Sequence, residues 1–207
     1  MGGDLSPDRL LHAYARGIFP WYSQGEPILW WTPEPRCVLF PEELFVSKSL
    51  KKRLRKPYSV TCNEEFATVM HLCATVDERR DNTWINTDML KAYNELYRLG
   101  YAHSIEVWLN TQLVGGLYGV KLGRVFFGES MFSHASDGSK IALAALANMC
   151  RSAGVKLIDC QVENPHLISM GATLLSRLDF ERILSENVGQ DIDQARWQAP
   201  HQTKELL

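Results

Sequence analysis

Val125–Ser133 reads Val-Phe-Phe-Gly-Glu-Ser-Met-Phe-Ser, and the other predicted elements are arranged around this stretch. Its apolar and aromatic residues are typical of a buried strand. One carboxylate, Glu129, lies in the middle of the stretch. Because a buried acid costs free energy unless it is paired or hydrogen-bonded, Glu129 is a candidate functional residue.

A second polar island interrupts an apolar stretch at Leu157–Gln161, which reads Leu-Ile-Asp-Cys-Gln. Asp159 and Gln161 are two positions apart, so a regular strand would direct both side chains to one face. We expect this strand and Val125–Ser133 to form one site. A buried polar network with a purely structural role is the alternative interpretation of the Asp159 and Gln161 pair.

The neighbouring sequence predicts a meander followed by a helix and a returning strand. A helix is predicted at 139–153, and a buried strand at 155–161. This order of elements is that of the acetyltransferase-like (GNAT) α/β fold. We therefore predict an α/β (α+β) protein with a GNAT-like catalytic domain at residues 61–207. The predicted antiparallel strands of the meander are 103–109, 113–122 and 125–132.

Residues 1–60 are expected to form a small N-terminal domain that is rich in aromatic residues and proline. Ser6 is the expected cap of a short helix that begins at Pro7. Proline removes donors from a sheet, so 18–36 is expected to combine irregular aromatic structure with short strands. Trp21 fits either a small aromatic core or a partly exposed ring that stacks on a planar ligand such as a base.

Further helices are predicted from cap residues and apolar stripes. Asn63 is the expected cap of a helix at 64–76, and Thr87 is the expected cap of a helix at 88–99. The remaining predictions are a charged loop, a short helix, a final ordered segment and an irregular tail, at 77–82, 165–170, 174–180 and beyond 187.

The composition indicates a soluble globular protein. The chain has 207 residues, of which 45% are hydrophobic and 22% charged, and a formal net charge of −2. No apolar run approaches the ~18 residues of a membrane span, and we expect no secretory signal. The five cysteines have no CxxC spacing and are expected to be free thiols in a reducing cytosol. The six histidines show no metal-binding spacing, so we expect no metal.

A run of basic residues lies at 48–56, in a chain that is acidic overall. Ser47 is expected to cap a helix there, with Leu50 and Leu54 on its buried stripe. No acid is interleaved, so the basic side chains cannot pair within the helix. The run is either a solvated helix face or a contact for a phosphate backbone. Its basic residues are Lys48, Lys51, Lys52, Arg53, Arg55 and Lys56.

The loop before the predicted helix at 139–153 bears on the choice of acyl donor. A GNAT enzyme holds the pyrophosphate of acetyl-CoA with an Arg/Gln-x-x-Gly-x-Gly/Ala loop. Residues 133–140 read Ser-His-Ala-Ser-Asp-Gly-Ser-Lys and lack this signature. The predicted fold therefore favours acyl transfer, whereas the loop argues against acetyl-CoA as the donor, and we expect no cofactor.

Seven blocks of sequence, in order and over nearly the whole chain, resemble the leucyl/phenylalanyl-tRNA–protein transferases. Residues 137–140 and the C-terminal tail depart from the family pattern. Because the first block stands at the start of the chain, we expect the upstream segment typical of the family to be absent. The blocks include Ala-Tyr-x-x-Gly-Ile-Phe-Pro-Trp at 13–21, and the others lie at 2–7, 27–36, 102–108, 113–120, 127–133 and 157–161.

The resemblance implies a bacterial cytosolic enzyme. Such an enzyme moves Leu or Phe, and Met less well, from aminoacyl-tRNA to the N-terminal Arg or Lys of a protein. The transfer marks that protein for degradation by the N-degron route. We expect a monomer with no membrane association.

By resemblance, Gln161 is the catalytic residue and Asp159 is its partner. The reaction is aminolysis of an activated ester by an α-amine with a pKa of ~8, so positioning can supply up to ~7–11 kcal/mol of the barrier. A neutral amide is a poor base, and alignment of the amine is therefore favoured over proton abstraction. Glu129 is expected to balance the charge of the N-terminal Arg or Lys, or to hold the amine.

The apolar donor side chain and the terminal adenine of the tRNA require separate subsites, and the basic run would hold the tRNA backbone. Phe126 and Glu129 should face opposite sides of a regular strand. Both can line one cleft only if the strand is bulged, and Gly128 is the expected position of the bulge. The resemblance places the adenine on Trp21 and Trp84, and the donor side chain among Leu117, Phe126, Leu143 and Ile158.

Two other functions fit parts of the sequence. A small-molecule N-acyltransferase that uses acyl-CoA fits the predicted fold, but it fits neither the loop at 133–140 nor the uninterrupted basic run. A non-catalytic RNA-binding module accounts for the basic run and the tryptophans, but it leaves Glu129 and the apolar pocket unexplained.

Overall fold

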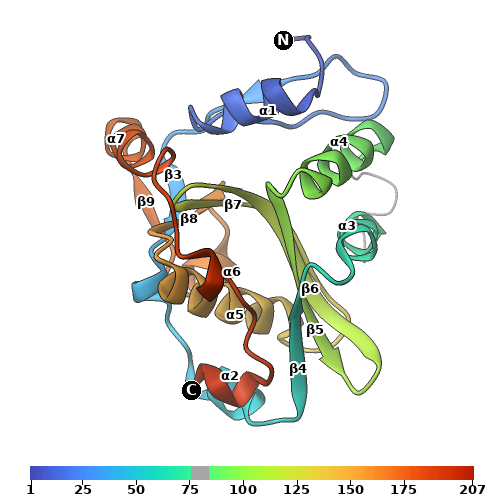
Figure 1. Ribbon diagram of the computed structural model, residues 1–207, viewed down its shortest axis with the longest axis vertical. Coiled ribbons are helices and arrows are strands. Elements are labelled where there is room, and N and C mark those ends of the chain that lie inside the picture. Colours follow the sequence, from blue (N-terminus) through green and yellow to red (C-terminus); the bar gives the residue numbers. More distant parts are fainter. Residues whose placement is uncertain (76–83) are drawn as a thin grey trace.

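The computed structural model describes residues 1–75 and 84–207, which are built around one seven-stranded sheet (Figure 1). Its strands follow the order β4-β5-β6-β7-β8-β3-β9. The combination of this sheet with helices confirms the predicted α/β class, and the likeness to the GNAT fold stays a prediction. The strands are β3 (Arg36–Leu39), β4 (Tyr58–Cys62), β5 (Ala102–Leu109), β6 (Gln112–Leu122), β7 (Val125–Ser133), β8 (Leu157–Gln161) and β9 (Thr173–Leu175).

The centre of the sheet has the predicted connectivity. β5, β6 and β7 form an antiparallel meander, and β8 returns parallel to β7 after helix α5 (Gly138–Ala153). α5 begins in close contact with β6, since a Cβ atom on Gly115 would lie 2.5 Å from Gly138. Gly154 ends the helix in the left-handed conformation, which glycine adopts without strain. The meander, the helix and the returning strand are confirmed.

Helices cover both faces of the sheet and divide its core in two. On one face lie α3 (Phe66–Thr75) and α4 (Thr87–Arg98), whose apolar stripes belong to the first core cluster. On the other face lie α5 and α2 (Lys48–Leu54), which contribute to the second cluster. Figure 1 shows α3 and α4 on one side of the sheet and α5 on the other. Residues that line a site at the sheet are thereby fixed from both faces.

The N-terminal segment forms helix α1 (Pro7–Tyr14) and a small ribbon in which β1 (Phe19–Pro20) pairs with β2 (Trp30–Trp31). Pro7 is the first helical residue, as predicted. The chain then enters the main sheet as β3, which lies between β8 and β9. The sheet thus includes a strand from before residue 60, and the division of the chain near that residue stays a prediction.

Two predicted helix caps were wrong. Asn63 has a φ of 65°, and its side-chain oxygen accepts a hydrogen bond from the backbone N–H of Ser104, so it ties the end of β4 to β5. α4 is capped by Asn86 and not by Thr87, because the Asn86 side chain accepts from backbone N–H groups in the first turn of the helix. In both places an asparagine side chain accepts from backbone N–H groups that the sequence pattern did not indicate.

The C-terminal region contains more regular structure than the sequence predicted. Helix α7 (Arg177–Asn187) follows β9 and is capped by Ser176, where only one ordered segment at 174–180 was expected. Phe180 of α7 packs in the first core cluster. The predicted tail contains short turns of helix as well. The other short helices in the described ranges are η1 (Pro41–Glu43), α6 (Pro165–Ile168), η3 (Gln194–Arg196) and η4 (Thr203–Leu206).

The charged loop expected at 77–82 lies outside the described residues. Within the described ranges, no helix combines the length and the apolar composition needed to cross a membrane.

Candidate active site

Strand β7 carries a bulge at Glu129. In its pairing with β6, Tyr118 lies opposite Ser130 and Gly119 lies opposite Gly128, so Glu129 is an extra residue in the ladder. An extra residue interrupts the alternation of side chains between the two faces of a strand. The predicted bulge is therefore confirmed, with the extra residue at Glu129 and not at Gly128.

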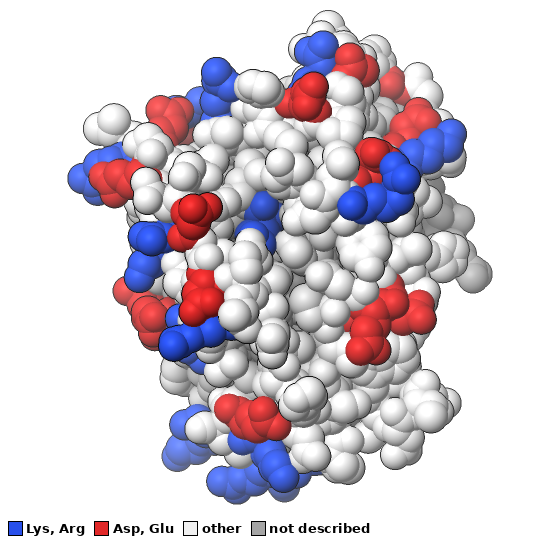
Figure 2. All heavy atoms as spheres, viewed as in Figure 1, with Lys and Arg blue, Asp and Glu red and all other residues white. Residues whose placement is uncertain are grey.

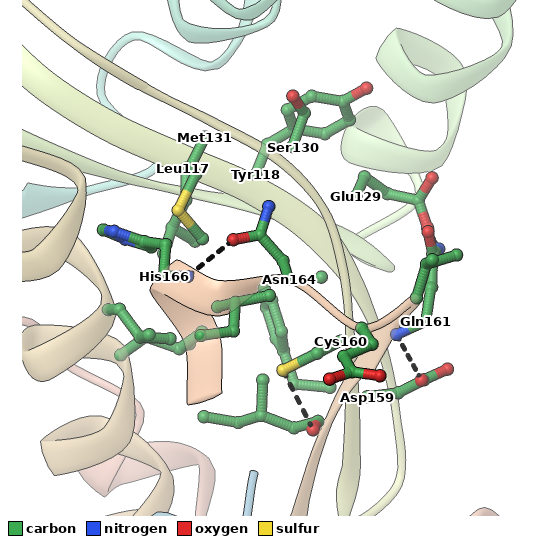
Figure 3. A pocket seen from close by; sticks show the side chains of 18 of the residues that line it. Leu117, Tyr118, Glu129, Ser130, Met131, Asp159, Cys160, Gln161, Asn164 and His166 are labelled. Atoms are coloured by element: carbon green, nitrogen blue, oxygen red, sulfur yellow. Dashed lines mark hydrogen bonds between the residues drawn. The ribbon is translucent and has the colours of Figure 1, made fainter. Parts of the chain in front are cut away.

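A cavity of about 320 Å³ lies beside the bulge (Figure 3). Phe126 and Glu129 both line it, which a regular strand would not allow. Met131 and Leu146 extend its apolar part, and the sequence had not identified them. All the apolar residues predicted for the donor pocket line this cavity, namely Leu117, Phe126, Leu143 and Ile158.

The Glu129 carboxylate is buried and accepts side-chain hydrogen bonds from three described residues. The hydroxyl of Tyr14 donates to Oε1 at 2.7 Å, and that of Tyr93 donates to Oε2 at 3.1 Å. Nε2 of Gln161 donates to Oε1 at 2.8 Å. The two tyrosine hydroxyl oxygens also lie within hydrogen-bonding distance of each other, and either hydroxyl could donate its one proton there in place of its bond to Glu129. Donors from α1, α4 and β8 thus satisfy the buried acid.

Burial raises the pKa of Glu129 from its ordinary value of 4.5 to about 7. The hydrogen bonds from Tyr14, Tyr93 and Gln161 oppose this rise, while the nearby charge of Asp159 adds to it. Burial also raises the pKa of both tyrosines, so they remain neutral donors. Glu129 therefore changes its charge near neutral pH, which is a common property of functional groups in clefts.

Gln161 reaches Glu129 from an irregular end of β8. Cys37 lies opposite Gln161 and Val38 lies opposite Asp159, so β8 has an extra residue between them, and Gln161 has a φ of 64°. The assumption of a regular strand at Asp159 and Gln161 was therefore wrong, although both residues line the larger cavity. In Figure 3 the Gln161 side chain is directed toward Glu129.

Asp159 is fully buried and is bound by Arg36, which the sequence had not identified. Arg36 Nε donates to Oδ1 of Asp159 at 2.8 Å, and Nη2 donates to Oδ2 at 2.7 Å. Oδ1 also accepts from the backbone N–H of Gln161 at 2.9 Å. Asp159 thus contacts Gln161 through the backbone, while a cation compensates its burial.

A smaller cavity of about 150 Å³ adjoins the first, because Trp21, Glu129 and Gln161 line both. Trp84 lines the smaller cavity. The Trp21 residue is 43% exposed, and its ring centroid lies 6.3 Å from that of Trp31. An exposed aromatic ring beside a cavity is better suited to stacking on a planar ligand than to a small aromatic core.

Helix α2 carries the basic run at one end of the molecule, where Figure 2 shows a group of Lys and Arg side chains. Its cap Ser47 and its buried residues Leu50 and Leu54 are as predicted. Arg53 lies 3.5 Å from Asp137, an acid that comes from the loop before α5 and not from the run itself. The other basic residues are exposed, and they are Lys48, Lys51, Lys52, Arg55 and Lys56.

The rim of the larger cavity is polar. Asn164 caps α6 by accepting a hydrogen bond from the backbone N–H of His166 at 2.8 Å, and both residues line the cavity together with Glu163. In the part of the chain that the structure describes, no three His, Cys, Asp or Glu side chains are grouped as metal ligands.

The site residues missed by sequence reasoning carry weak local signals. Tyr14 and Arg36 stand inside blocks that support the family resemblance, and Tyr93 stands on the apolar stripe predicted for 88–99. None was singled out, because each has its partner far along the chain. A buried carboxylate requires donors, so tyrosines on apolar faces were the available signal.

The fold and the site together define the class of protein. The apolar cavity can hold the side chain of an acyl group, and the amide and carboxylate at its end can align an amine. This geometry suits an acyltransferase that works by positioning its substrates.

Comparison with known proteins agrees with this class. A family model described as "Leucyl/phenylalanyl-tRNA protein transferase" matches residues 38–185, and the model of the N-terminal domain of the same family matches residues 3–34. The leucyl/phenylalanyl-tRNA--protein transferase of Syntrophobacter fumaroxidans is 54% identical over 200 residues, which cover 96% of this chain and 86% of that protein. That of Hydrogenovibrio crunogenus is 51% identical over 208 residues, covering 97% of this chain and 81% of that protein.

The chain therefore belongs to the leucyl/phenylalanyl-tRNA protein transferase family. It is an aminoacyltransferase.

Proposed function

We propose that this chain transfers Leu or Phe, and Met less well, from aminoacyl-tRNA to the N-terminal Arg or Lys of an acceptor protein. The product has a new peptide bond and is marked for N-degron degradation in the cytoplasm, and the enzyme acts as a monomer without a cofactor. The observation that carries the proposal is the junction of the two cavities, since Glu129 and Gln161 line both.

The larger cavity fits the side chain of the donor amino acid. Its apolar walls, with Leu117, Phe126, Leu143 and Ile158 among them, favour Leu, Phe and Met over polar side chains. Apolar pockets separate similar apolar side chains by only ~1–3 kcal/mol, which supports acceptance of more than one donor.

The smaller cavity fits the adenosine at the end of the tRNA. Trp21 and Trp84 line it and offer ring faces on which a base can stack. The exposed basic residues of α2 would contact the phosphate backbone.

The polar junction fits the acceptor amine. Because Nε2 of Gln161 donates to Glu129, its Oε1 is left to accept a hydrogen bond from the amine. Glu129 would be ionised by the cationic side chain of the arriving N-terminal Arg or Lys, since an opposite charge favours the charged form of a carboxyl, while the α-amine binds in its neutral form. Asp159 would orient Gln161 through its backbone N–H.

In the proposed reaction, the neutral α-amine attacks the carbonyl carbon of the aminoacyl ester. A C–N bond forms, the bond from the carbonyl carbon to the ribose oxygen breaks, and the amine proton passes to the leaving oxygen or to water. Gln161 aligns the amine and is not required as a base, because the ester is already activated. Positioning of this kind can contribute up to ~7–11 kcal/mol.

One assay tests the proposal against its alternatives. The protein is incubated with Phe-tRNA and a peptide that begins with Arg, and the products are analysed by mass spectrometry, with Ala-starting peptide and phenylacetyl-CoA as comparison substrates. The proposal predicts an Arg-peptide extended by one Phe residue, and little extension of the Ala-peptide. Transfer from the acyl-CoA would favour a small-molecule acyltransferase, and tRNA binding without a peptide product would favour an RNA-binding module.

A further inference from the structure

Arg36 occupies an unusual place for a cation. It stands at the start of β3, is 1% exposed, and its guanidinium lies between two aromatic rings. The distance from its Cζ atom is 5.0 Å to the ring centroid of Phe19 and 4.6 Å to that of Phe180. Phe19 belongs to the N-terminal ribbon and Phe180 to α7. Elements from both ends of the chain thus enclose this one side chain.

Stability alone does not explain a buried Arg36–Asp159 pair. Removing two charges from water is costly, and apolar residues of similar volume often stabilise a fold as well as a buried ion pair does. In addition, Nη1 of Arg36 is buried without a hydrogen-bond partner among the described residues. The guanidinium is therefore held by its two hydrogen bonds to the Asp159 carboxylate and by the two rings. The ion pair calls for a role beyond packing.

The hydrogen bond between Asp159 and the backbone N–H of Gln161 indicates what this role is. Oδ1 of Asp159 accepts from Arg36 Nε at 2.8 Å and from the backbone N–H of Gln161 at 2.9 Å. Gln161 has a φ of 64°, a left-handed conformation that is strained for residues other than glycine. Such strain persists only where surrounding contacts hold it. The bond from Asp159 is such a contact, and it directs the Gln161 side chain to Glu129.

We propose that Arg36 is a positioning residue for aminoacyl transfer. Its two hydrogen bonds fix the Asp159 carboxylate, and Asp159 in turn holds Gln161 in the left-handed conformation that places the amide at the junction of the cavities. This inference rests on the proposed role of Gln161. Bidentate hydrogen bonding to a carboxylate requires two donors in one plane, which guanidinium has and the ammonium of lysine lacks. An Arg36→Lys protein therefore keeps the charge and loses the alignment.

The test compares transfer of Phe from Phe-tRNA to an Arg-peptide in the wild type, Arg36→Lys, Arg36→Ala and Gln161→Ala. Arg177→Lys is the matched control, because Arg177 also pairs with an acid, Glu34, but is only partly buried and lies outside both cavities. Thermal unfolding of each protein sets a temperature at which all are folded. Guanidinium ion at about 10 mM is then added to each protein, as a replacement for the guanidinium group that the Arg36 variants lack.

We expect Arg36→Lys to lower kcat at least tenfold with little change in the KM for Phe-tRNA, and Arg177→Lys to behave as the wild type. Guanidinium should restore part of the activity of Arg36→Ala and none of that of Gln161→Ala, which a purely structural role would not produce. A folded Arg36→Lys protein with wild-type kcat, or Arg36→Ala without rescue, would overturn the inference. If Gln161→Ala itself turned over normally, the proposed mechanism would fail and not this positioning step alone.

Discussion

The two walls of the larger cavity are built in different ways. The polar wall, with Glu129 and Gln161, is held by directed hydrogen bonds from distant elements; Tyr14 reaches Glu129 across 115 positions of sequence. The apolar wall, with Leu117, Leu143 and Ile158, comes from β6, α5 and β8 and is held by packing in the second core cluster.

The difference shows which part of the site depends on geometry. Each polar group has named partners at fixed distances, so one lost hydrogen bond displaces the next group in the chain of contacts. The apolar wall needs volume and shape, and cores tolerate apolar substitution when volume is kept. Substitutions in the polar wall should therefore stop the reaction, whereas substitutions in the apolar wall should change which donor is used.

The largest effect is expected from Gln161→Ala. Loss of the amide removes the group that aligns the amine, and we expect kcat/KM for Phe transfer to fall by about 10²-fold or more. Gln112→Ala, an exposed glutamine on β6, is the control. Affinity for Phe-tRNA should stay close to the wild-type value, measured by filter binding. Undiminished turnover would remove Gln161 from the mechanism.

The second effect concerns stability and pH. The pKa of Glu129 is about 7 in the folded protein and 4.5 ordinarily, so the folded state binds more protons between these values. The contribution to stability is fully present below pH 4.5 and is lost as the pH rises through 7, by on the order of 3 kcal/mol. The free energy of unfolding in urea should therefore fall less from pH 5 to pH 8 in Glu129→Gln than in the wild type. Parallel curves for the two proteins would contradict the raised pKa.

A third prediction follows for the acceptor. Glu129→Gln removes the charge that would balance a cationic N-terminus, and a charge-assisted hydrogen bond is worth ~1.5–3 kcal/mol. We expect the KM for an Arg-peptide to rise by about tenfold or more, with little change in the KM for Phe-tRNA. In the wild type the peptide KM should fall as the pH rises through 7, and this dependence should weaken in the variant. Glu95→Gln, on the surface of α4, is the control. A change in the KM for Phe-tRNA larger than the change in the peptide KM would assign Glu129 to the donor side.

The apolar wall should give smaller effects that concern donor choice. Leu143→Ala enlarges the cavity and should shift the ratio of Phe to Leu transfer toward Phe, whereas Leu143→Phe should shift it toward Leu. Each shift is limited to ~1–3 kcal/mol, and about tenfold is expected. The measurement is competition between Phe-tRNA and Leu-tRNA, with Leu178→Ala on the surface as the control. If both variants kept the wild-type ratio, the donor side chain would not bind beside Leu143.

The smallest effect per residue is expected from the basic run. Replacing Lys51, Lys52 and Arg53 with glutamine should weaken tRNA binding several-fold and flatten its dependence on salt, because each phosphate contact contributes ~0.7–0.9 to the logarithmic slope. Arg53 should contribute least, since Asp137 lies 3.5 Å away. Lys91→Gln on α4 is the control. An unchanged slope would identify the run as a solvated helix face.

Much of the fold could be predicted because its signals are local. The meander and α5 follow from alternation, helical periodicity and the stop at Gly154. The bulge in β7 was predicted by parity once the family resemblance had placed Phe126 in the same cleft as Glu129. The apolar wall was also predicted, but through the family resemblance and not from the spacing of its residues.

The rest could not be predicted because it depends on contacts between distant residues. Arg36 and Asp159 are 123 positions apart, and the sequence near either residue does not indicate the other as its partner. The irregular end of β8 was missed for the same reason, because the extra residue shows only in the pairing with β3. A regular strand was assumed there, and that assumption was wrong.

The central claim is that Gln161 aligns the acceptor amine and does not abstract its proton. Gln161→Glu tests this most directly, because glutamate keeps the length of the side chain and is a real base. With saturating Phe-tRNA and Arg-peptide, we expect its single-turnover rate to be at least about tenfold below the wild type at every pH from 6 to 9, since the bond donated to Glu129 is lost and a second acid lies beside it. A rate equal to or above that of the wild type, rising as the new carboxyl ionises, would contradict the claim.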